Sequence, residues 1–128
     1  MTTRAFIFTD RELDIMDILW ERGSGTVVEV RERLGDDLAY TTVLTVLRTL
    51  EEKGFLVHES EGRAYRYYPV VERRQAQDSH RARLIRKLYA GSPELLLEHL
   101  VTDEGVTDEE LKRMRRVVDR RLKGQKGG

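Results

Sequence analysis

Hydrophobic positions in the first third of the chain recur with the period of a helix. Over residues 13–20 the apolar side chains return every three or four positions, behind a capping-box pair formed by Thr9 and Glu12. A second capping residue, Thr26, opens a shorter helical pattern that Gly35 ends. This pattern predicts two helices, each with one apolar face.

The next segment predicts a third helix and a hairpin. Helical spacing runs from Thr41 to Gly54, with valines and leucines on one side. Two β-prone stretches, 55–59 and 64–68, then flank a turn that contains Gly62. Three helices and a hairpin within about 60 residues is the order of a winged helix-turn-helix, in which the hairpin forms the wing. The expected fold class is therefore mainly α with a small β hairpin.

Threonines gather on the polar face of the third helix. At about 100° per residue, one arc of about 120° on residues 41–49 of this helix contains no carboxylate. It consists of Thr41, Thr42, Thr45, Arg48 and Thr49. Because threonine is a mediocre helix former, four of them on one exposed face indicate a function. Hydroxyl and guanidinium groups bind phosphates and base edges, so we interpret this arc as a DNA-reading face. The alternative is an ordinary solvated helix face.

Two arginines lie on the expected wing. Arg63 follows the turn at Gly62, and Arg66 points to the strand face opposite Tyr65 and Tyr67. A cation at a wing tip typically binds backbone phosphate and adds affinity without reading the sequence. For Arg63 the alternative is a solvated turn arginine.

The second half of the chain predicts three further helices. Helical spacing continues over 71–91, Ser92 and Pro93 give a new start signal, and Thr107 with Glu110 forms another capping box. The last helix carries apolar residues at the coiled-coil spacing i, i+3, i+7 and i+11. Short helices this apolar need a partner surface.

We therefore expect residues 1–70 to form a winged-helix DNA-binding domain and residues 71–128 a helical dimerisation domain. A twofold homodimer would let two reading heads bind a pseudo-palindromic site. The alternative is that these helices fold back on the winged helix of the same chain. The expected dimer-interface residues are Ile85, Leu88, Tyr89, Leu96, Leu97, Leu100, Leu111, Met114, Val118 and Leu122.

The charge of the chain sums to zero, from 23 basic and 23 acidic side chains among 128 residues. Residues 1–70 hold 9 of the basic and 13 of the acidic ones, so the reading half is acidic and the remainder is basic. This acidic half favours a competing interpretation, a winged-helix protein–protein interaction module without DNA binding. The arc of threonines and Arg48 nevertheless presents no acid to a phosphate backbone.

No catalytic or metal site is predicted. The chain has no cysteine, which excludes disulfide scaffolds, thiolate zinc sites and cysteine nucleophiles. His58, His80 and His99 are scattered, without metal-ligand spacing. No apolar run approaches the roughly 18 residues of a membrane span, and the N-terminal residues lack the pattern of a signal peptide. We expect a cytoplasmic protein that is not an enzyme, without cofactor or metal and without membrane insertion.

Three sequence runs together resemble one protein family. They are residues 9–20 (TDRELDIMDILW), 40–50 (YTTVLTVLRTL) and 61–69 (EGRAYRYYP). In this order and spacing they are similar to the penicillinase-repressor family of the BlaI/MecI type, to which the copper-responsive CopY type is related. The tail is similar in layout, so the resemblance spans nearly the whole chain.

The resemblance implies a bacterial transcriptional repressor, homodimeric and linked to antibiotic resistance. It places Thr42 and Thr45 nearest the bases, Thr41 close to the DNA backbone and Arg63 on the wing. Many members carry arginine immediately before the last leucine of this helix, where this chain has Thr49. The expected DNA-binding residues are Tyr40, Thr41, Thr42, Thr45, Arg48, Thr49, Arg63 and Arg66.

The resemblance also implies how repression ends. Family members of the BlaI/MecI type are cleaved within the dimerisation module, through a membrane sensor-protease pathway that detects β-lactam. The matching segment here is about His99 and Leu100, where the usual asparagine–phenylalanine pair of the family is absent. The copper-responsive relatives bind metal through C-terminal cysteine pairs, which this chain lacks.

Overall fold

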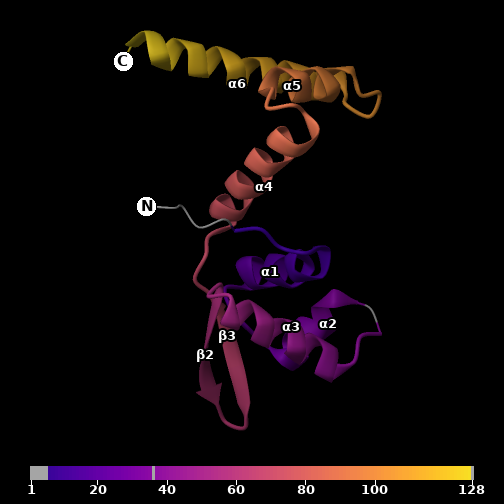
Figure 1. The fold of residues 1–128 in the computed structure, drawn as a ribbon, viewed down its shortest axis with the longest axis vertical. Coiled ribbons are helices and arrows are strands. Elements are labelled where there is room, and N and C mark those ends of the chain that lie inside the picture. Colours follow the sequence, from indigo (N-terminus) through magenta and orange to yellow (C-terminus); the bar gives the residue numbers. More distant parts are fainter. Residues whose placement is uncertain (1–5, 36, 128) are drawn as a thin grey trace. The chain divides into compact units, whose positions relative to one another are not determined.

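The structure is a computed structural model that describes residues 6–35 and 37–127, with side chains as far as residue 124. Its contacts divide the chain into two compact units, Met1–Ala82 and Arg83–Gly128. Along the chain in Figure 1 the elements are α1 (Asp10–Arg22), β1 (Gly25–Thr26), α2 (Val27–Leu34), α3 (Tyr40–Glu52), β2 (Leu56–Glu61), β3 (Ala64–Pro69), α4 (Arg73–Leu88), α5 (Pro93–Thr102) and α6 (Asp108–Gly127).

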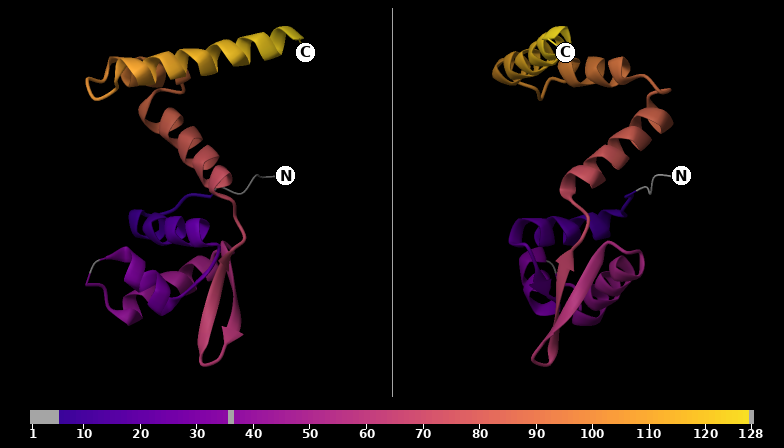
Figure 2. Two further views of the ribbon diagram at one scale, coloured as in Figure 1. Left: turned by 180° about the vertical axis from the view of Figure 1, so that it is seen from behind. Right: turned by 90° about the vertical axis from the view of Figure 1, so that its left-hand side faces the viewer.

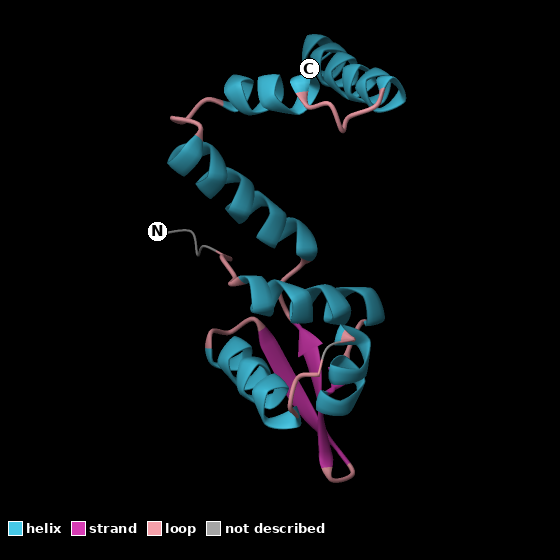
Figure 3. Ribbon diagram, turned by 90° about the vertical axis from the view of Figure 1, so that its right-hand side faces the viewer, coloured by secondary structure: helices cyan, strands magenta, loops and turns pink. Residues whose placement is uncertain are grey.

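The first unit is a winged helix, which confirms the predicted fold class. Helices α1, α2 and α3 accompany a three-stranded antiparallel sheet of strand order β1-β3-β2. In the β2–β3 hairpin, His58 is opposite Tyr67 and Glu59 is opposite Arg66. The structure adds the short strand β1 on the other edge of β3, where Thr26 is opposite Arg66 (Figure 3). β3 is therefore the central strand of the sheet.

The capping boxes predicted from the sequence begin α1 and α2. The Thr9 hydroxyl accepts from the Glu12 amide at 3.2 Å, and the Glu12 carboxylate accepts from the Thr9 amide at 2.8 Å. Thr26 and Glu29 repeat this exchange at 3.3 Å and 3.1 Å. Gly23 ends α1 with a φ of 88°, a left-handed conformation that glycine adopts without strain. Both helices thus begin where the sequence predicted.

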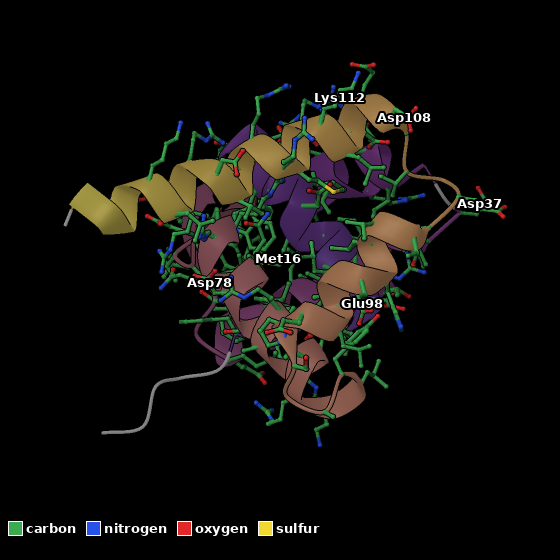
Figure 4. All side chains as sticks on the ribbon, turned by 90° about the horizontal axis from the view of Figure 1, so that it is seen from above. Met16, Asp37, Asp78, Glu98, Asp108 and Lys112 are labelled. Atoms are coloured by element: carbon green, nitrogen blue, oxygen red, sulfur yellow. The ribbon has the colours of Figure 1, made fainter. Side chains whose placement is uncertain are left out.

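One hydrophobic core holds the first unit together. Helix α1 contributes Ile15, Met16 (labelled in Figure 4) and Leu19, and α3 contributes Leu47 and Leu50, all with no exposed surface. Burying an aliphatic or aromatic side chain of this size stabilises a fold by about 1.5–3 kcal/mol. The other buried apolar side chains are Phe8, Ile18, Val27, Val30, Val43, Phe55, Leu56, Tyr67, Val71 and Ala76.

The winged-helix unit continues beyond residue 70, where the sequence had placed its end. Val71 and Ala76 are buried in the same core. The Trp20 Nε1–H donates to the Val71 carbonyl at 2.8 Å, and the Phe8 amide donates to His80 Nε2 at 3.1 Å. The first turns of α4 therefore belong to the winged helix, and the division between the units lies after residue 82 instead of residue 70.

The second unit contains the end of α4 together with α5 and α6 (Figure 2). No side chain between residues 83 and 124 is buried. The Tyr89 ring lies edge-on to the His99 ring, with 5.2 Å between their centroids. This unit therefore has no buried core within one chain. Its exposed large apolar side chains are Leu84, Leu88, Leu97, Leu100, Val101, Val117, Val118 and Leu122.

Candidate nucleic-acid interface

Helix α3 turns its polar face away from the core. Val43, Leu47 and Leu50 are fully buried, and their burial fixes which side of the helix faces inward. The predicted arc consequently lies on the outer side. Of its five members only Thr49 is half-buried, and the other four are exposed. Tyr40, at the start of the helix, is exposed as well.

The first turn of α3 offers hydrogen-bond donors and contains no acid. The residue before the helix is Ala39, whose side chain accepts no hydrogen bond, and the first turn contains no carboxylate. Because a helix N-terminus carries partial positive charge, such an end favours an anion such as phosphate. The Thr45 hydroxyl donates to the Thr41 carbonyl at 2.8 Å, so its oxygen is left to accept hydrogen bonds.

Two arginines of this region are free to bind a ligand. Arg48 on α3 and Arg63 on the wing are exposed, and neither side chain forms an ion pair or hydrogen bond within the described part of the chain. Arg63 follows Gly62, whose φ of 60° allows the tight turn between β2 and β3. The tip of this hairpin extends beyond α2 and α3 (Figures 1 and 2). Both guanidinium groups can therefore reach a phosphate or a base edge.

Arg66, the third arginine that the sequence suggested as a DNA contact, is held by two carboxylates. It donates to Glu61 at 2.8 Å and 2.9 Å and to Glu29 at 2.9 Å and 3.0 Å. Hydrogen bonds from Arg66 and from the Thr26 amide lower the pKa of the Glu29 carboxyl to about 2. The strand pattern predicted which face Arg66 occupies, but not the carboxylates that lie against that face. Arg66 therefore differs from Arg63, because its guanidinium is already neutralised.

The other face of the hairpin contacts the end of α3 through His58. Its Nδ1 lies 2.8 Å and 2.6 Å from the two carboxylate oxygens of Glu51. Its ring lies 4.3 Å from the Tyr65 ring and 5.8 Å from the ring of Tyr67, which is buried. Burial is the main cause that raises the pKa of Tyr67. The sequence had indicated only a surface residue at His58, since the contact joins two different elements.

The predicted dimer-interface residues lie on the surface of the second unit. Ile85, Tyr89, Leu96, Leu111 and Met114 are half-buried; Leu88, Leu97, Leu100, Val118 and Leu122 are exposed. The predicted cleavage pair, His99 and Leu100, is exposed within α5. Three acids begin α6, among them Asp108, and cations follow from Lys112 onward (Figure 4).

Most of the chain matches the sequence model of one protein family. The penicillinase repressor family matches residues 8–120. The chain belongs to this family. The match confirms the family resemblance that the three sequence runs predicted and carries it into α6.

Relatives in this family match the chain to different extents. The chain is 21% identical to the methicillin resistance regulatory protein MecI of Staphylococcus aureus (strain N315) over 123 residues, which make up 94% of this chain and 100% of MecI. It is 47% identical to the transcriptional regulator BlaI of Mycobacterium tuberculosis (strain CDC 1551 / Oshkosh) over 64 residues, 48% of this chain and 46% of BlaI. Its fold is similar to that of a MarR-family transcriptional regulator from Rhodococcus sp. RHA1, with a TM-score of 0.52 at 20% identity over 87% of this chain and 71% of that one.

In the described residues, histidine and acidic side chains form no cluster that could bind a metal. The three histidines are on β2, α4 and α5. Residues 6–35 and 37–127 contain no group of three or more histidine, aspartate or glutamate side chains that could hold a metal ion. Within the same residues, no helix combines the length and the apolar character needed to cross a bilayer.

Proposed function

We propose that this member of the penicillinase repressor family binds a pseudo-palindromic DNA operator as a homodimer and represses transcription in the cytoplasm. The observation that carries the proposal is the exposed polar face of α3, with its threonines and Arg48 and a first turn that contains no acid. Helix α3 enters the major groove, with Thr42 and Thr45 at base edges and Thr41 at the backbone. The chain acts by binding alone and needs neither a catalytic group nor a cofactor.

The remaining contacts flank this reading face. Arg48 binds a guanine edge or a phosphate, and Arg63 binds phosphate from the wing tip. Tyr40 and Thr49 lie at the two ends of the face, where they contact the backbone. Arg66 takes no part, because two carboxylates already bind its guanidinium.

The homodimer is supported by the second unit. Its side chains leave no buried core between residues 83 and 124, although its leucines and valines are large enough to form one. A twofold partner would cover the seam of Leu111, Met114, Val118 and Leu122. The two winged-helix domains of a dimer then bind one DNA molecule far more tightly than either domain alone.

Salt titration tests the DNA-binding proposal. The probe is a duplex that contains the promoter upstream of the chain's own gene, and a scrambled duplex is the control. Each phosphate neutralised contributes about −0.9 to the slope of log K against log salt concentration, so four or more arginine and helix-end contacts give a slope of about −4. A protein–protein interaction module, the competing function, would give no salt-dependent binding to either duplex.

We further propose that cleavage at about His99–Leu100 releases the operator, through a membrane sensor-protease pathway that responds to β-lactam or other cell-wall stress. The cut would detach α6 and its apolar seam, so the dimer would weaken and operator affinity would fall by orders of magnitude. Leu100→Glu mimics part of this damage by placing a charge at the same exposed apolar position. An unchanged dimer mass together with unchanged operator affinity in this variant would reject the role of the segment.

A further inference from the structure

Arg66 uses all five of its N–H donors inside the winged-helix unit. Its Nε donates to Glu61 Oε1 at 2.8 Å, and its Nη1 donates to the Ser24 hydroxyl at 3.2 Å and to Glu29 Oε1 at 2.9 Å. Its Nη2 donates to Glu29 Oε2 at 3.0 Å and to Glu61 Oε2 at 2.9 Å. Because an arginine has only five such donors, none is left for a phosphate.

These partners come from separate parts of the unit. Arg66 is on the central strand β3, Glu61 ends β2 next to the wing turn, Ser24 precedes β1, and Glu29 is in the first turn of α2. Both carboxylates bind the guanidinium through two oxygens, a planar geometry that fixes orientation as well as distance. The Arg66 side chain is only 18% exposed. One side chain therefore connects the wing to the start of the helix-turn-helix.

Glu29 is itself held by the helices. Besides Arg66, its carboxylate accepts from the Thr26 amide at 3.1 Å, which caps α2. Arg22, at the end of α1, lies 3.0 Å from the same carboxylate. Glu29, which binds Arg66 on the wing, is thus also held by Arg22 of α1 and by the amide that precedes α2.

Glu61 places a negative charge on the wing that Arg66 offsets. It lies one residue before the wing turn, where a carboxylate repels the DNA backbone, and its side chain is 53% exposed. Both hydrogen bonds that the structure records for it come from Arg66. Arg66 therefore offsets the charge of Glu61 and, through its other hydrogen bonds, connects the end of β2 to Glu29.

We propose that Arg66 is a positioning residue, which with Glu29 and Glu61 locks the wing at a fixed angle to α2 and so aims Arg63 at the DNA backbone. The inference rests on the proposed DNA-binding function. It assigns Arg66 no direct contact with DNA, and it makes Glu61 favourable for binding despite its charge.

Paired substitutions of two wing carboxylates test the proposal in the full-length chain. Glu59 is also exposed on β2 and lies opposite Arg66 in the sheet register, and its side chain has no recorded ion pair or hydrogen bond in the described residues. Glu59→Gln and Glu61→Gln each remove one negative charge from the wing. If charge alone matters, both variants bind the promoter duplex more tightly than the unmodified chain.

The positioning role predicts weaker DNA binding for only one of the two variants. Glu59→Gln binds as tightly as the unmodified chain or more tightly, whereas Glu61→Gln binds about fivefold to tenfold more weakly, the loss expected when one phosphate contact is misplaced. Arg66→Lys weakens binding to a similar extent, because an ammonium keeps the charge but cannot bind two carboxylates bidentately. Urea unfolding of each variant, followed through the single tryptophan, Trp20, checks that the unit remains folded.

A double-mutant cycle separates positioning from general weakening. Arg63→Ala lowers affinity in the unmodified chain but has little further effect in the Glu61→Gln background, since Arg63 is already misplaced there. Tighter binding by Glu61→Gln, or additive effects of the two substitutions, would overturn the proposal. Failure of the proposed function itself has a different signature, an unmodified chain without salt-dependent DNA binding, and it would overturn this inference as well.

Discussion

The Lys53 ammonium lies 2.7 Å from a carboxylate oxygen of Glu12, 41 residues earlier in the chain. Glu12 is 4% exposed and also accepts from the Thr9 amide at the start of α1. Burial raises the pKa of Glu12, but hydrogen bonds from Lys53 and Thr9 outweigh it, so the pKa lies below its ordinary value. One carboxylate therefore joins the start of α1 to the residue that ends α3.

We predict that Lys53→Met destabilises the winged-helix unit by about 1–3 kcal/mol, because it leaves a buried carboxylate without its cation. Arg33→Met is the matched control in the same unit. Arg33 lies 3.7 Å from Glu21 in a pair with both side chains about half exposed, so its loss should cost less than about 0.5 kcal/mol. Urea unfolding followed by Trp20 fluorescence measures both, and equal shifts of the two midpoints would contradict the prediction.

Arg48 is expected to contribute both to sequence recognition and to phosphate binding, and two substitutions separate these contributions. Arg48→Ala is expected to weaken operator binding by about 1–3 kcal/mol and to relax the choice of operator. Arg48→Lys keeps the charge but loses bidentate recognition of guanine, so it should lower the ratio of specific to non-specific affinity while leaving the salt slope unchanged. Fluorescence anisotropy with promoter and scrambled duplexes measures both quantities. Binding by Arg48→Ala equal to that of the unmodified chain would remove this residue from the reading face.

Two adjacent valines on α6 distinguish a specific dimer seam from general surface hydrophobicity. Val118 belongs to the seam, Val117 does not, and the two are 45% and 54% exposed. Val118→Glu should convert a homodimer to monomers of 14.9 kDa and raise the operator Kd by about 100-fold or more. Val117→Glu should leave both the mass and the Kd close to those of the unmodified chain. Analytical ultracentrifugation and operator titration would reject the seam if the two variants behaved alike.

Local signals predicted the helices of this chain well. Thr9 with Glu12 and Thr26 with Glu29 are capping boxes that involve neighbours three residues apart, so their hydrogen bonds can be read from spacing alone. The valine–leucine face of α3 likewise fixed which side would be buried. The outer face of α3 was therefore predictable, with its threonines and Arg48.

Contacts between distant segments were not predictable in this way. Spacing shows that Glu12 caps a helix, but not that Lys53 reaches it from α3. It shows which strand face Arg66 occupies, but not that Glu29 lies against that face. Val71 joins the core because Trp20 and the start of α4 approach each other in space. The winged-helix unit therefore extends past residue 70, where the sequence had placed its end. In each case the partner depends on tertiary packing, which a single sequence does not encode in its periodicity.

Low pH is expected to weaken the ion pair between Glu29 and Arg66, which connects the wing to α2. Its pKa is lowered from 4.5 to about 2 by Arg66, the Thr26 amide and Arg22. Because the folded state binds the proton less readily than the unfolded state, the ionised carboxylate stabilises the fold fully above about pH 4.5, and this contribution is lost as the pH falls toward 2.

The comparison of Glu29→Gln with the unmodified chain isolates this contribution. The variant should unfold at lower urea concentration at pH 6, and the difference in unfolding free energy should shrink steadily between pH 4.5 and pH 2, where the carboxyl group becomes neutral in both states. Glu32→Gln, an exposed α2 neighbour without a recorded ion pair in the described residues, should show almost no difference at any pH. A difference for Glu29→Gln that stays constant from pH 6 to pH 2 would mean that Arg66 does not hold this carboxylate ionised, and the wing anchor would then depend on shape alone.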